Sequence, residues 1–495
     1  MPTVLQRWLP LALLALLALG LRTWDLDRRP MHADEANQAV KTGQLLEGHG
    51  YTFDPADHHG PTLYYAALPL AWIRGESTLA ELTETTVRLV PALAGTLAVL
   101  LLYFLAHALA ASSSVAETAI SSSTRRSAFF AAAFLAVSPS AVYFSRFFIQ
   151  ETLLLTFTLA TFLFAARWWR SGRLAWALAA GASAGLMQAT KASAPLFLLA
   201  ALAGLLIARP SRPATLRLTR DLTAAFAAAL LIAALFYSSF GANAGGIRDA
   251  LGTYPSMFDR LSAGASGHEK PAWYYFSFLG WHRDGGVVTH QLVFSLLALT
   301  GAVIAIVSRP SRGLRGAASF TVILLLVFSL TSYKTPWHVI HLIPGLSLLA
   351  AGALVVPRKH PSFYTLIGIL CVLLQLGQVR LTSFQRPADE RNPYAYVHSS
   401  SDVLKLRPLA QAAHAAFPSA PIRVISEESW PMPWYFRDIP NIGYWSAVPD
   451  DCDGSLVIAS AGLADQVEAR LKGNYTPAFI GLRPGFTLIV FKRQP

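Results

Sequence analysis

Leu9-Pro-Leu-Ala-Leu-Leu-Ala-Leu-Leu-Ala-Leu-Gly-Leu-Arg-Thr23 is an apolar run near the start of the chain, and Met31-His-Ala-Asp-Glu-Ala36 follows it shortly afterwards. Such a run predicts either a secretory signal peptide or a membrane helix. No small-residue cleavage site precedes Thr23-Trp-Asp-Leu-Asp-Arg-Arg29, so we expect a retained helix. Acids at a membrane edge cost solvation energy if they are drawn inward, which makes Asp34 and Glu35 functional candidates. The start of a solvated loop would also account for them.

The composition is that of a membrane protein. Of the 495 residues, 54% are hydrophobic and only 14% are charged, whereas a soluble chain has about 25% charged residues. Cys371 lies in an apolar segment and Cys452 in a polar one, so we expect both thiols to be free. A net charge of +12 would suit a nucleic-acid partner. The arginines cluster in short loops between apolar runs, however, and this predicts no nucleic-acid binding.

Ten further apolar segments predict membrane spans, each close to the roughly 20 residues that cross a bilayer. With the first helix they make about eleven, at 86–110, 127–144, 150–169, 173–190, 192–208, 222–240, 288–308, 317–333, 338–356 and 362–381. The stretch 62–73 is too short to cross and is rich in aromatic residues, so we expect an interfacial helix. The predicted fold class is mainly α, a polytopic transmembrane helical bundle.

The positive-inside rule predicts the orientation. Alternate loops carry clusters of cations: Arg125 and Arg126; Arg167, Arg170 and Arg173; Arg209, Arg212, Arg217 and Arg220; Arg309, Arg312 and Arg315; Arg358 and Lys359. These loops fall on one side of an eleven-span model. We therefore expect an integral protein of the cytoplasmic (inner) membrane, with the N-terminus in the cytoplasm. The first loop 24–85, the loop 241–287 and residues 385–495 are then extracytoplasmic.

Residues 385–495 alternate helical and strand patterns. The strand patterns are 422–426, 455–460 and 486–492, and the helical ones are 402–416 and 464–471. Short β-rich runs between amphipathic helices predict a small α/β domain. We therefore expect two domains, a membrane domain 1–384 and an extracytoplasmic domain 385–495.

Several chemically active side chains share the predicted outer face. Asp34 and Glu35, beside His32, can act as a general base or bind a divalent cation. Glu151 opens a predicted helix, where the helix dipole alone would favour a carboxylate by roughly 0.3–1 kcal/mol. Arg146 can pair with Glu151 or donate two parallel hydrogen bonds to a phosphate.

The remaining candidates are cations and histidines. Lys191 at a helix end is either a snorkelling lysine or a charge for a lipid-linked phosphate. Lys334 and His338 flank Thr335-Pro-Trp337, and neither Pro nor Trp explains them, so a phosphate or sugar contact is plausible. His58 and His59, beside an acid, fit metal binding or a polar turn equally well, since no further ligand spacing is visible.

The order of these motifs resembles a known family. The motifs are His-Ala-Asp34-Glu35-Ala, His59-Gly-Pro-Thr-Leu-Tyr-Tyr65, Ser145-Arg146 with Glu151, Lys191, and Tyr333-Lys-Thr-Pro-Trp337. They resemble the membrane GT-C glycosyltransferases of family 39, which include protein O-mannosyltransferases and the aminoarabinose transferase of lipid A. The chain is most similar to the prokaryotic subgroup of flippase-activity-associated proteins, in which stretches like Asn392-Pro-Tyr-Ala-Tyr-Val-His398 and Trp430-Pro-Met-Pro-Trp434 recur.

The resemblance implies a GT-C helical bundle that transfers a sugar, with inversion, from a polyprenyl-phosphate donor to an acceptor protein, lipid or glycan. Asp34 would match the first-loop acid that serves as the base, with Glu35 beside it. Glu151 would match a second acid that contacts acceptor or metal, although many members carry Asp there. Arg146 and Lys191 would contact the donor phosphate.

Two points stay open at the level of sequence. No cofactor is certain, and a divalent metal near Asp34 and Glu151 is the one suggested. The alternative function is a non-catalytic flippase-associated or transport component for lipid-linked sugars. A transporter more often places polar groups near the middle of its spans, and few are found there in this chain.

Overall fold

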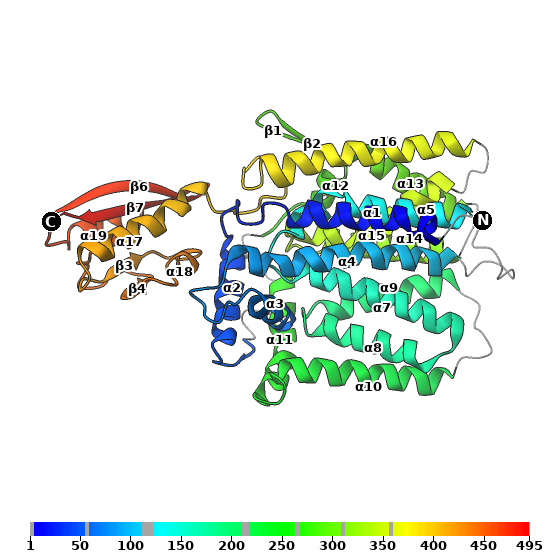
Figure 1. Ribbon diagram of the computed structural model, residues 1–495, viewed down its shortest axis with the longest axis horizontal. Helices are drawn as coiled ribbons and strands as arrows, with labels where there is room; N and C mark the ends of the chain where they lie inside the picture. The colour runs from blue at the N-terminus through cyan, green and yellow to red at the C-terminus, as the bar shows by residue number, and fades with distance from the viewer. Residues whose placement is uncertain are drawn as a thin grey trace. The chain divides into compact units, whose positions relative to one another are not determined.

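The computed structural model describes residues 4–54, 59–110, 122–209, 217–262, 268–307, 312–355 and 360–494. The chain packs into two compact units (Figure 1). The membrane unit comprises Met1–Trp24, Gly50–Ala66 and Arg88–Arg386. The C-terminal unit comprises Asp25–His49, Ala67–Val87 and Pro387–Pro495. The predicted division into domains at 384/385 stays a prediction.

The membrane unit is built from apolar helices. They are α1 (Val4–Thr23), α4 (Glu84–Ala110), α5 (Ser122–Ala136), α6 (Pro139–Phe144), α7 (Glu151–Ser171), α8 (Leu174–Gln188), α9 (Ala194–Ala208), α10 (Leu218–Tyr237), α11 (Gly245–Ser262), α12 (Tyr274–Leu279), α13 (Leu292–Val307), α14 (Arg312–Leu330), α15 (Ile343–Val355) and α16 (Pro361–Val379). Among the described residues, six helical segments are long and apolar enough to cross a membrane and five more are apolar but shorter. The predicted class, an integral membrane protein with a helical bundle, is confirmed.

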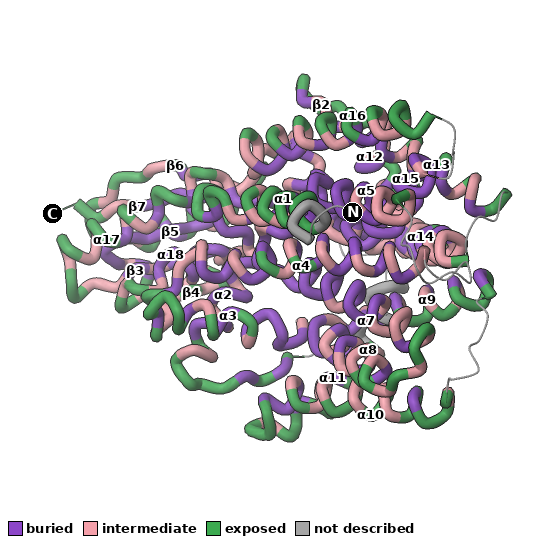
Figure 2. Tube along the Cα trace, turned by 45° about the vertical axis from the view of Figure 1, so that its right-hand side comes forward, coloured by how far each residue is buried: buried purple, intermediate pink, exposed green. Residues whose placement is uncertain are grey.

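Helix packing in this unit leaves apolar side chains on its periphery. α10 packs on α8 and α8 on α7, while α13 packs on α15 (Figure 1). Leu222, Phe226 and Leu230 on α10 are exposed, and Figure 2 shows exposed and half-buried residues along this helix. Apolar side chains in such numbers would be unfavourable in water but not against lipid tails.

The predicted span 127–144 is two helices rather than one. α5 ends at Ala136, and Ser138 caps α6 by accepting a hydrogen bond from the Ala141 amide. Pro139 occupies the first turn of α6, where its missing N–H costs nothing. The break ends α5 early and gives the chain a turn at Ser145–Gln150 from which α7 begins at Glu151.

The loop 241–287 contains more structure than the sequence predicts. Besides α11 and α12, it ends in a hairpin of β1 (Trp281–Asp284) with β2 (Val287–His290). Gly285 and Gly286 form the two-residue turn, with φ angles of 47° and 82°. Two consecutive positive φ angles are what a tight hairpin turn requires, and glycine adopts them without steric cost.

The C-terminal unit contains α2 (Ala33–Leu46) and a five-stranded mixed sheet of order β4-β3-β5-β7-β6. Its strands are β3 (Ile422–Ile425), β4 (Ile442–Trp445), β5 (Leu456–Ser460), β6 (Tyr475–Arg483) and β7 (Phe486–Arg493), accompanied by α17 (Leu406–Ala416), α18 (Met432–Tyr435) and α19 (Ala464–Glu468). β3 lies parallel to β4 and β5, and β7 antiparallel to β5 and β6. The predicted α/β class is confirmed, and so are the strands at β3, β5 and β7.

The two strands that the sequence did not predict are the edges of the sheet. β4 has only four residues and contains Gly443, and β6 contains Pro477. Glycine and proline weaken the strand signal in a sequence, and an edge strand tolerates both.

α3 (Thr62–Ile73) confirms the helix that was predicted for the first loop.

Close helix packing in the membrane unit depends on small residues, which a matched pair of glycines tests. A Cβ on Gly301 of α13 would overlap the Leu349 carbonyl of α15, whereas Gly377 of α16 has no heavy atom within 4 Å of that position. Gly301→Ala should therefore destabilise the detergent-solubilised protein by about 1–3 kcal/mol. Gly377→Ala should leave the thermal unfolding midpoint unchanged or raise it slightly. Equal midpoints for the two variants would contradict the packing described here.

Candidate functional site

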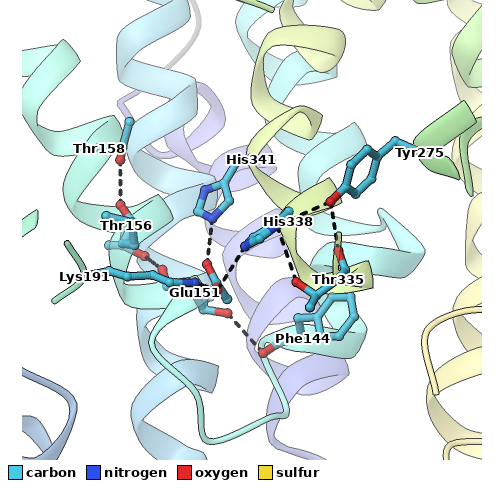
Figure 3. A network of polar contacts seen from close by, with 11 residues as sticks. Phe144, Glu151, Thr156, Thr158, Lys191, Tyr275, Thr335, His338 and His341 are labelled. Atoms are coloured by element: carbon cyan, nitrogen blue, oxygen red, sulfur yellow. Dashed lines mark hydrogen bonds and ion pairs between the residues drawn. The ribbon is translucent and has the colours of Figure 1, made fainter. Parts of the chain in front are cut away.

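Glu151 is the centre of a buried polar cluster in the membrane unit (Figure 3). It is the first residue of α7, and its side chain is only 3% exposed. Lys191, in the turn between α8 and α9, makes an ion pair with one carboxylate oxygen. His341 Nε2 lies 2.9 Å from the other. Burial of a carboxylate is costly unless it is paired and hydrogen-bonded, and these two partners together with the α7 N-terminus supply that compensation.

His338 extends the cluster. It lies with His341 on the short helix η2 (Pro336–His341), and its Nε2 is 3.9 Å from Glu151 Oε1. Its Nδ1 lies 3.3 Å from the Tyr275 hydroxyl and 3.4 Å from the Thr335 hydroxyl. The Tyr275 hydroxyl donates its one hydrogen to the Thr335 carbonyl at 3.2 Å, so its contact with His338 Nδ1 does not select a tautomer of the ring. Burial raises the pKa of the Tyr275 hydroxyl, so that it remains a neutral donor.

Two members of this cluster are accessible and two are not. The side chains of Lys191 and His338 are 19% and 20% exposed, whereas those of Glu151 and His341 are 3% and 1% exposed. A ligand therefore meets a lysine and a histidine, with the carboxylate behind them. The lysine ammonium has three hydrogens and gives one to Glu151, which leaves two for an anion.

His59 lies beside Lys191, and the two are joined by backbone contacts. The two residues form an antiparallel bridge, and the Gly60 amide donates to the Thr190 carbonyl at 3.1 Å. A Cβ on Gly60 would overlap the Ala189 carbonyl, so the close approach requires glycine there. The Thr62 and Thr190 hydroxyls are 2.7 Å apart. The His59-Gly-Pro motif thus holds the Lys191 turn in place.

The C-terminal unit contains the other acids, and the structure separates their roles. His32 caps α2, with its Nδ1 accepting from the Asp34 amide at 3.0 Å. Glu35 is fully buried, pairs with Arg29 at 2.9 Å and accepts from the His32 amide at 3.2 Å. The Asp34 side chain is 44% exposed. Glu35 therefore completes a capping box, while the Asp34 carboxylate is exposed.

The remaining predicted residues lie elsewhere. Arg146 Nη1 donates to the Trp24 carbonyl at 2.5 Å, at the end of α1, and its guanidinium lies over the Phe384 ring. Lys334 is buried and its ammonium donates to the carbonyls of Lys270, at 3.0 Å, and Thr331. Burial lowers the pKa of Lys334. Both cations thus cap backbone carbonyls. His58 lies outside the described residues.

Two members of the cluster were not predicted from the sequence, His341 and Tyr275. Proline-initiated helical turns place residues three apart on one face, so the His338–His341 spacing was an available signal for His341. Tyr275 lies in an aromatic run with nothing local to mark it. Within the described ranges, no three His, Cys, Asp or Glu side chains are arranged to hold a metal ion, and the suggested metal near Asp34 and Glu151 stays a hypothesis.

Comparisons with known proteins agree with the predicted resemblance. The family model for dolichyl-phosphate-mannose-protein mannosyltransferases matches residues 67–240, a range that includes Glu151 and Lys191. The fold is similar to that of ArnT from Cupriavidus metallidurans bound to undecaprenyl phosphate, with a TM-score of 0.67, 15% identity and 97% of each chain covered. It is also similar to the oligosaccharyltransferase AglB from Archaeoglobus fulgidus in complex with an inhibitory peptide and a dolichol-phosphate. That match has a TM-score of 0.56 and 13% identity, and it covers 96% of this chain and 72% of AglB. No curated protein matches the sequence. The likeness to the GT-C glycosyltransferases is thereby confirmed, and the fold is of their type.

The coupling between Glu151 and Lys191 can be measured from the free energies of unfolding of single and double variants. Lys191→Met leaves a buried carboxylate without its cation and should cost about 3–5 kcal/mol. Glu151→Gln should also destabilise the protein, and the double variant should lose less than the sum, by about 0.5–3 kcal/mol. The exposed pair Lys405–Asp402 is the control, and its coupling should be under about 0.5 kcal/mol. Additive losses at Glu151 and Lys191 would argue against a coupled pair.

Proposed function

We propose that the protein is a membrane glycosyltransferase that moves a sugar from a polyprenyl-phosphate donor to an acceptor at the outer face of the membrane. The observation that carries this proposal is the position of the Glu151 cluster. Glu151 begins α7, Lys191 lies between α8 and α9, and η2 precedes α15. Every member therefore lies at a helix end, where the headgroup of a lipid-anchored donor resides, and not in mid-span.

The accessible members fit a phosphate leaving group. Lys191 has two ammonium hydrogens beyond its ion pair with Glu151 and can donate them to phosphate oxygens. The partly exposed His338 ring is a second candidate donor. Donors placed where negative charge develops lower the barrier most when water is excluded. Glu151 pairs with Lys191, and His341 in turn contacts the Glu151 carboxylate at 2.9 Å. The fold likeness to ArnT, which is bound to undecaprenyl phosphate in its structure, supports this assignment.

Asp34 is the base in this proposal. As the acceptor oxygen attacks the anomeric carbon, its proton passes to the Asp34 carboxylate, the bond from that carbon to the phosphate oxygen breaks, and the phosphate keeps the electron pair. One displacement without a covalent intermediate inverts the anomeric configuration. Asp34 suits the role because its carboxylate is 44% exposed, whereas Glu35 is buried in an ion pair with Arg29.

The alternative is a transport or flippase-associated component without chemistry. Transporters place substrate groups near the middle of broken spans. In α7, the Thr158 and Thr161 hydroxyls donate to carbonyls of their own helix. The Thr156 hydroxyl lies within donating distance of the Thr152 carbonyl of α7 and the Ala94 carbonyl of α4. This observation favours the transferase.

The test measures release of polyprenyl phosphate by the purified protein in lipid nanodiscs, with a panel of polyprenyl-phosphate sugars and candidate acceptors. Asp34→Asn should lower the turnover number by about 10²–10⁴ with little change in the KM for the donor, because a general base acts in the transition state. Asp284→Asn, which alters an exposed carboxylate on β1, should leave the rate unchanged.

One combined result would contradict the transferase proposal. If no donor in the panel is consumed, and vesicles containing either the parent or Asp34→Asn move labelled lipid-linked sugar between leaflets at equal rates, the transport function is correct and the transferase proposal is wrong.

A further inference from the structure

Two motifs of the C-terminal unit have no part in the proposed chemistry, Asn392–His398 and Trp430–Trp434. Both lie against the turn that carries Asp34. The Met31 amide donates to the Tyr435 hydroxyl at 2.8 Å, and the Ser399 hydroxyl donates to the Met31 carbonyl at 2.8 Å. The Trp434 indole donates to Glu84 at 2.7 Å. Residues 368 and 404 positions later in the chain thus contact Met31, the residue that precedes the His32-Ala-Asp34 turn.

The contacts of His398 with Arg29 and Tyr396 fix the tautomer of the His398 ring. Arg29 donates through Nη2 to Glu35 at 2.9 Å and through Nη1 to His398 Nε2 at 3.0 Å. An arginine only donates, so His398 Nε2 must accept. His398 Nδ1 lies 3.1 Å from the Tyr396 carbonyl, which only accepts, so Nδ1 carries the hydrogen. Both partners therefore require the same neutral tautomer.

His32 is fixed in the opposite tautomer by the same carbonyl. Its Nε2 lies 3.1 Å from the Tyr396 oxygen and must donate, which leaves Nδ1 free to accept from the Asp34 amide. The side chains of Arg29 and Glu35 are at most 8% exposed, and His32 and His398 are likewise buried. Each of these contacts joins a donor to an acceptor, and such pairing rigidifies a buried polar network.

Backbone strain occurs in the same segment. Val397, between Tyr396 and His398, has a φ of 51°, a conformation that is unfavourable for a β-branched residue. Such strain persists where the surroundings determine the backbone more strongly than local preference does. Here the Tyr396 carbonyl accepts from two histidines on one side, and His398 meets Arg29 on the other.

We infer that the segment Tyr396–Ser399 positions Asp34, acting through Arg29, Glu35 and His32. This inference rests on the proposed function of Asp34 as the base. His398, Tyr396 and Arg29 are positioning residues, because each acts on the α2 N-terminus and none needs to touch substrate. The inference gives the C-terminal unit a role in catalysis: it holds the orientation of the base.

The experiment follows amide hydrogen exchange in the peptide 31–39 of the full-length protein in nanodiscs. His398→Leu removes the acceptor for Arg29, so the Asp34 and Ala36 amides, which donate to His32, should exchange at least tenfold faster. His398→Gln keeps an oxygen acceptor at similar reach and should stay within about twofold of the parent. His414→Leu, a histidine of the same unit on α17, is the matched control and should match the parent.

Activity gives the second measurement, in the donor-consumption assay. His398→Leu should lower the turnover number at least tenfold with the donor KM within twofold, and His398→Gln should restore most of it. If the parent consumes no donor, the proposed function fails, while hydrogen exchange still decides whether the segment positions the turn.

Three results would overturn the inference. One is parent-like exchange of peptide 31–39 in His398→Leu. Another is an equal rise in exchange in strand β5, which would mean that His398 supports the whole unit. If His398→Leu does not fold, Arg29→Lys decides, because its single ammonium cannot span Glu35 and His398 as the fork does. Parent-like exchange in a folded Arg29→Lys protein would then be the contradicting result.

Discussion

A carboxylate buried at the start of an apolar helix is the constraint on which the membrane unit depends. Glu151 has almost no access to water, and a buried charge without partners is too costly to keep. The chain meets this demand with residues from three other segments: Lys191 from the α8–α9 turn, His341 and His338 from η2, and through His338 the hydroxyl of Tyr275. Each partner is itself buried or half-buried, so its own position depends on further contacts. The Lys191 turn is held by the His59-Gly-Pro backbone, and the His341 ring packs on Phe197 of α9.

Asp34 and Glu35 are neighbours in the sequence, but one side chain is exposed and the other is buried. Adjacent residues in the first turn of a helix point about 100° apart, so one can face the protein while the other faces outward. Glu35 faces inward, where Arg29 and the His32 amide satisfy it. Asp34 faces outward, and its carboxylate lies 3.8 Å from the His32 ring. The contacts that bury Glu35 also fix the start of the helix on which Asp34 lies.

The sequence was most informative where one strong force acts alone. Lipid demands continuous apolar segments, so the positions of most helices could be predicted. The break at Ser138–Pro139 was missed, since apolar residues continue across it and only the cap marks it. β4 and β6 were missed because edge strands bear Gly443 and Pro477. In the site, Glu151 and Lys191 were predicted from their positions at helix ends, and His338 from the Tyr333-Lys-Thr-Pro-Trp337 motif that precedes it. His341 was not predicted, although it lies three residues from His338. Tyr275 could not be predicted from the sequence, because only tertiary packing brings α12 to η2. Histidine is an uncommon N-cap, so the capping box formed by His32 and Glu35 was also not recognised.

The placement of charge also bears on how such a site can act on a lipid-linked substrate. A donor with a polyprenyl tail keeps that tail in the bilayer, so a site at a helix end meets its phosphate without drawing the charge into the hydrocarbon, where each unit charge costs several kcal/mol. A cation placed there must be kept from neutralising itself against lipid phosphates or from snorkelling away. In the proposed function, fixing Lys191 on Glu151 would prevent both, because the ammonium would be oriented before a donor arrives and would still have hydrogens to offer. A carboxylate behind a cation lowers the affinity for an anion in the ground state, yet it leaves the geometry ready for the charge that develops as the phosphate departs. Groups organised in advance for that charge need no rearrangement in the transition state, which is where such organisation contributes most to rate.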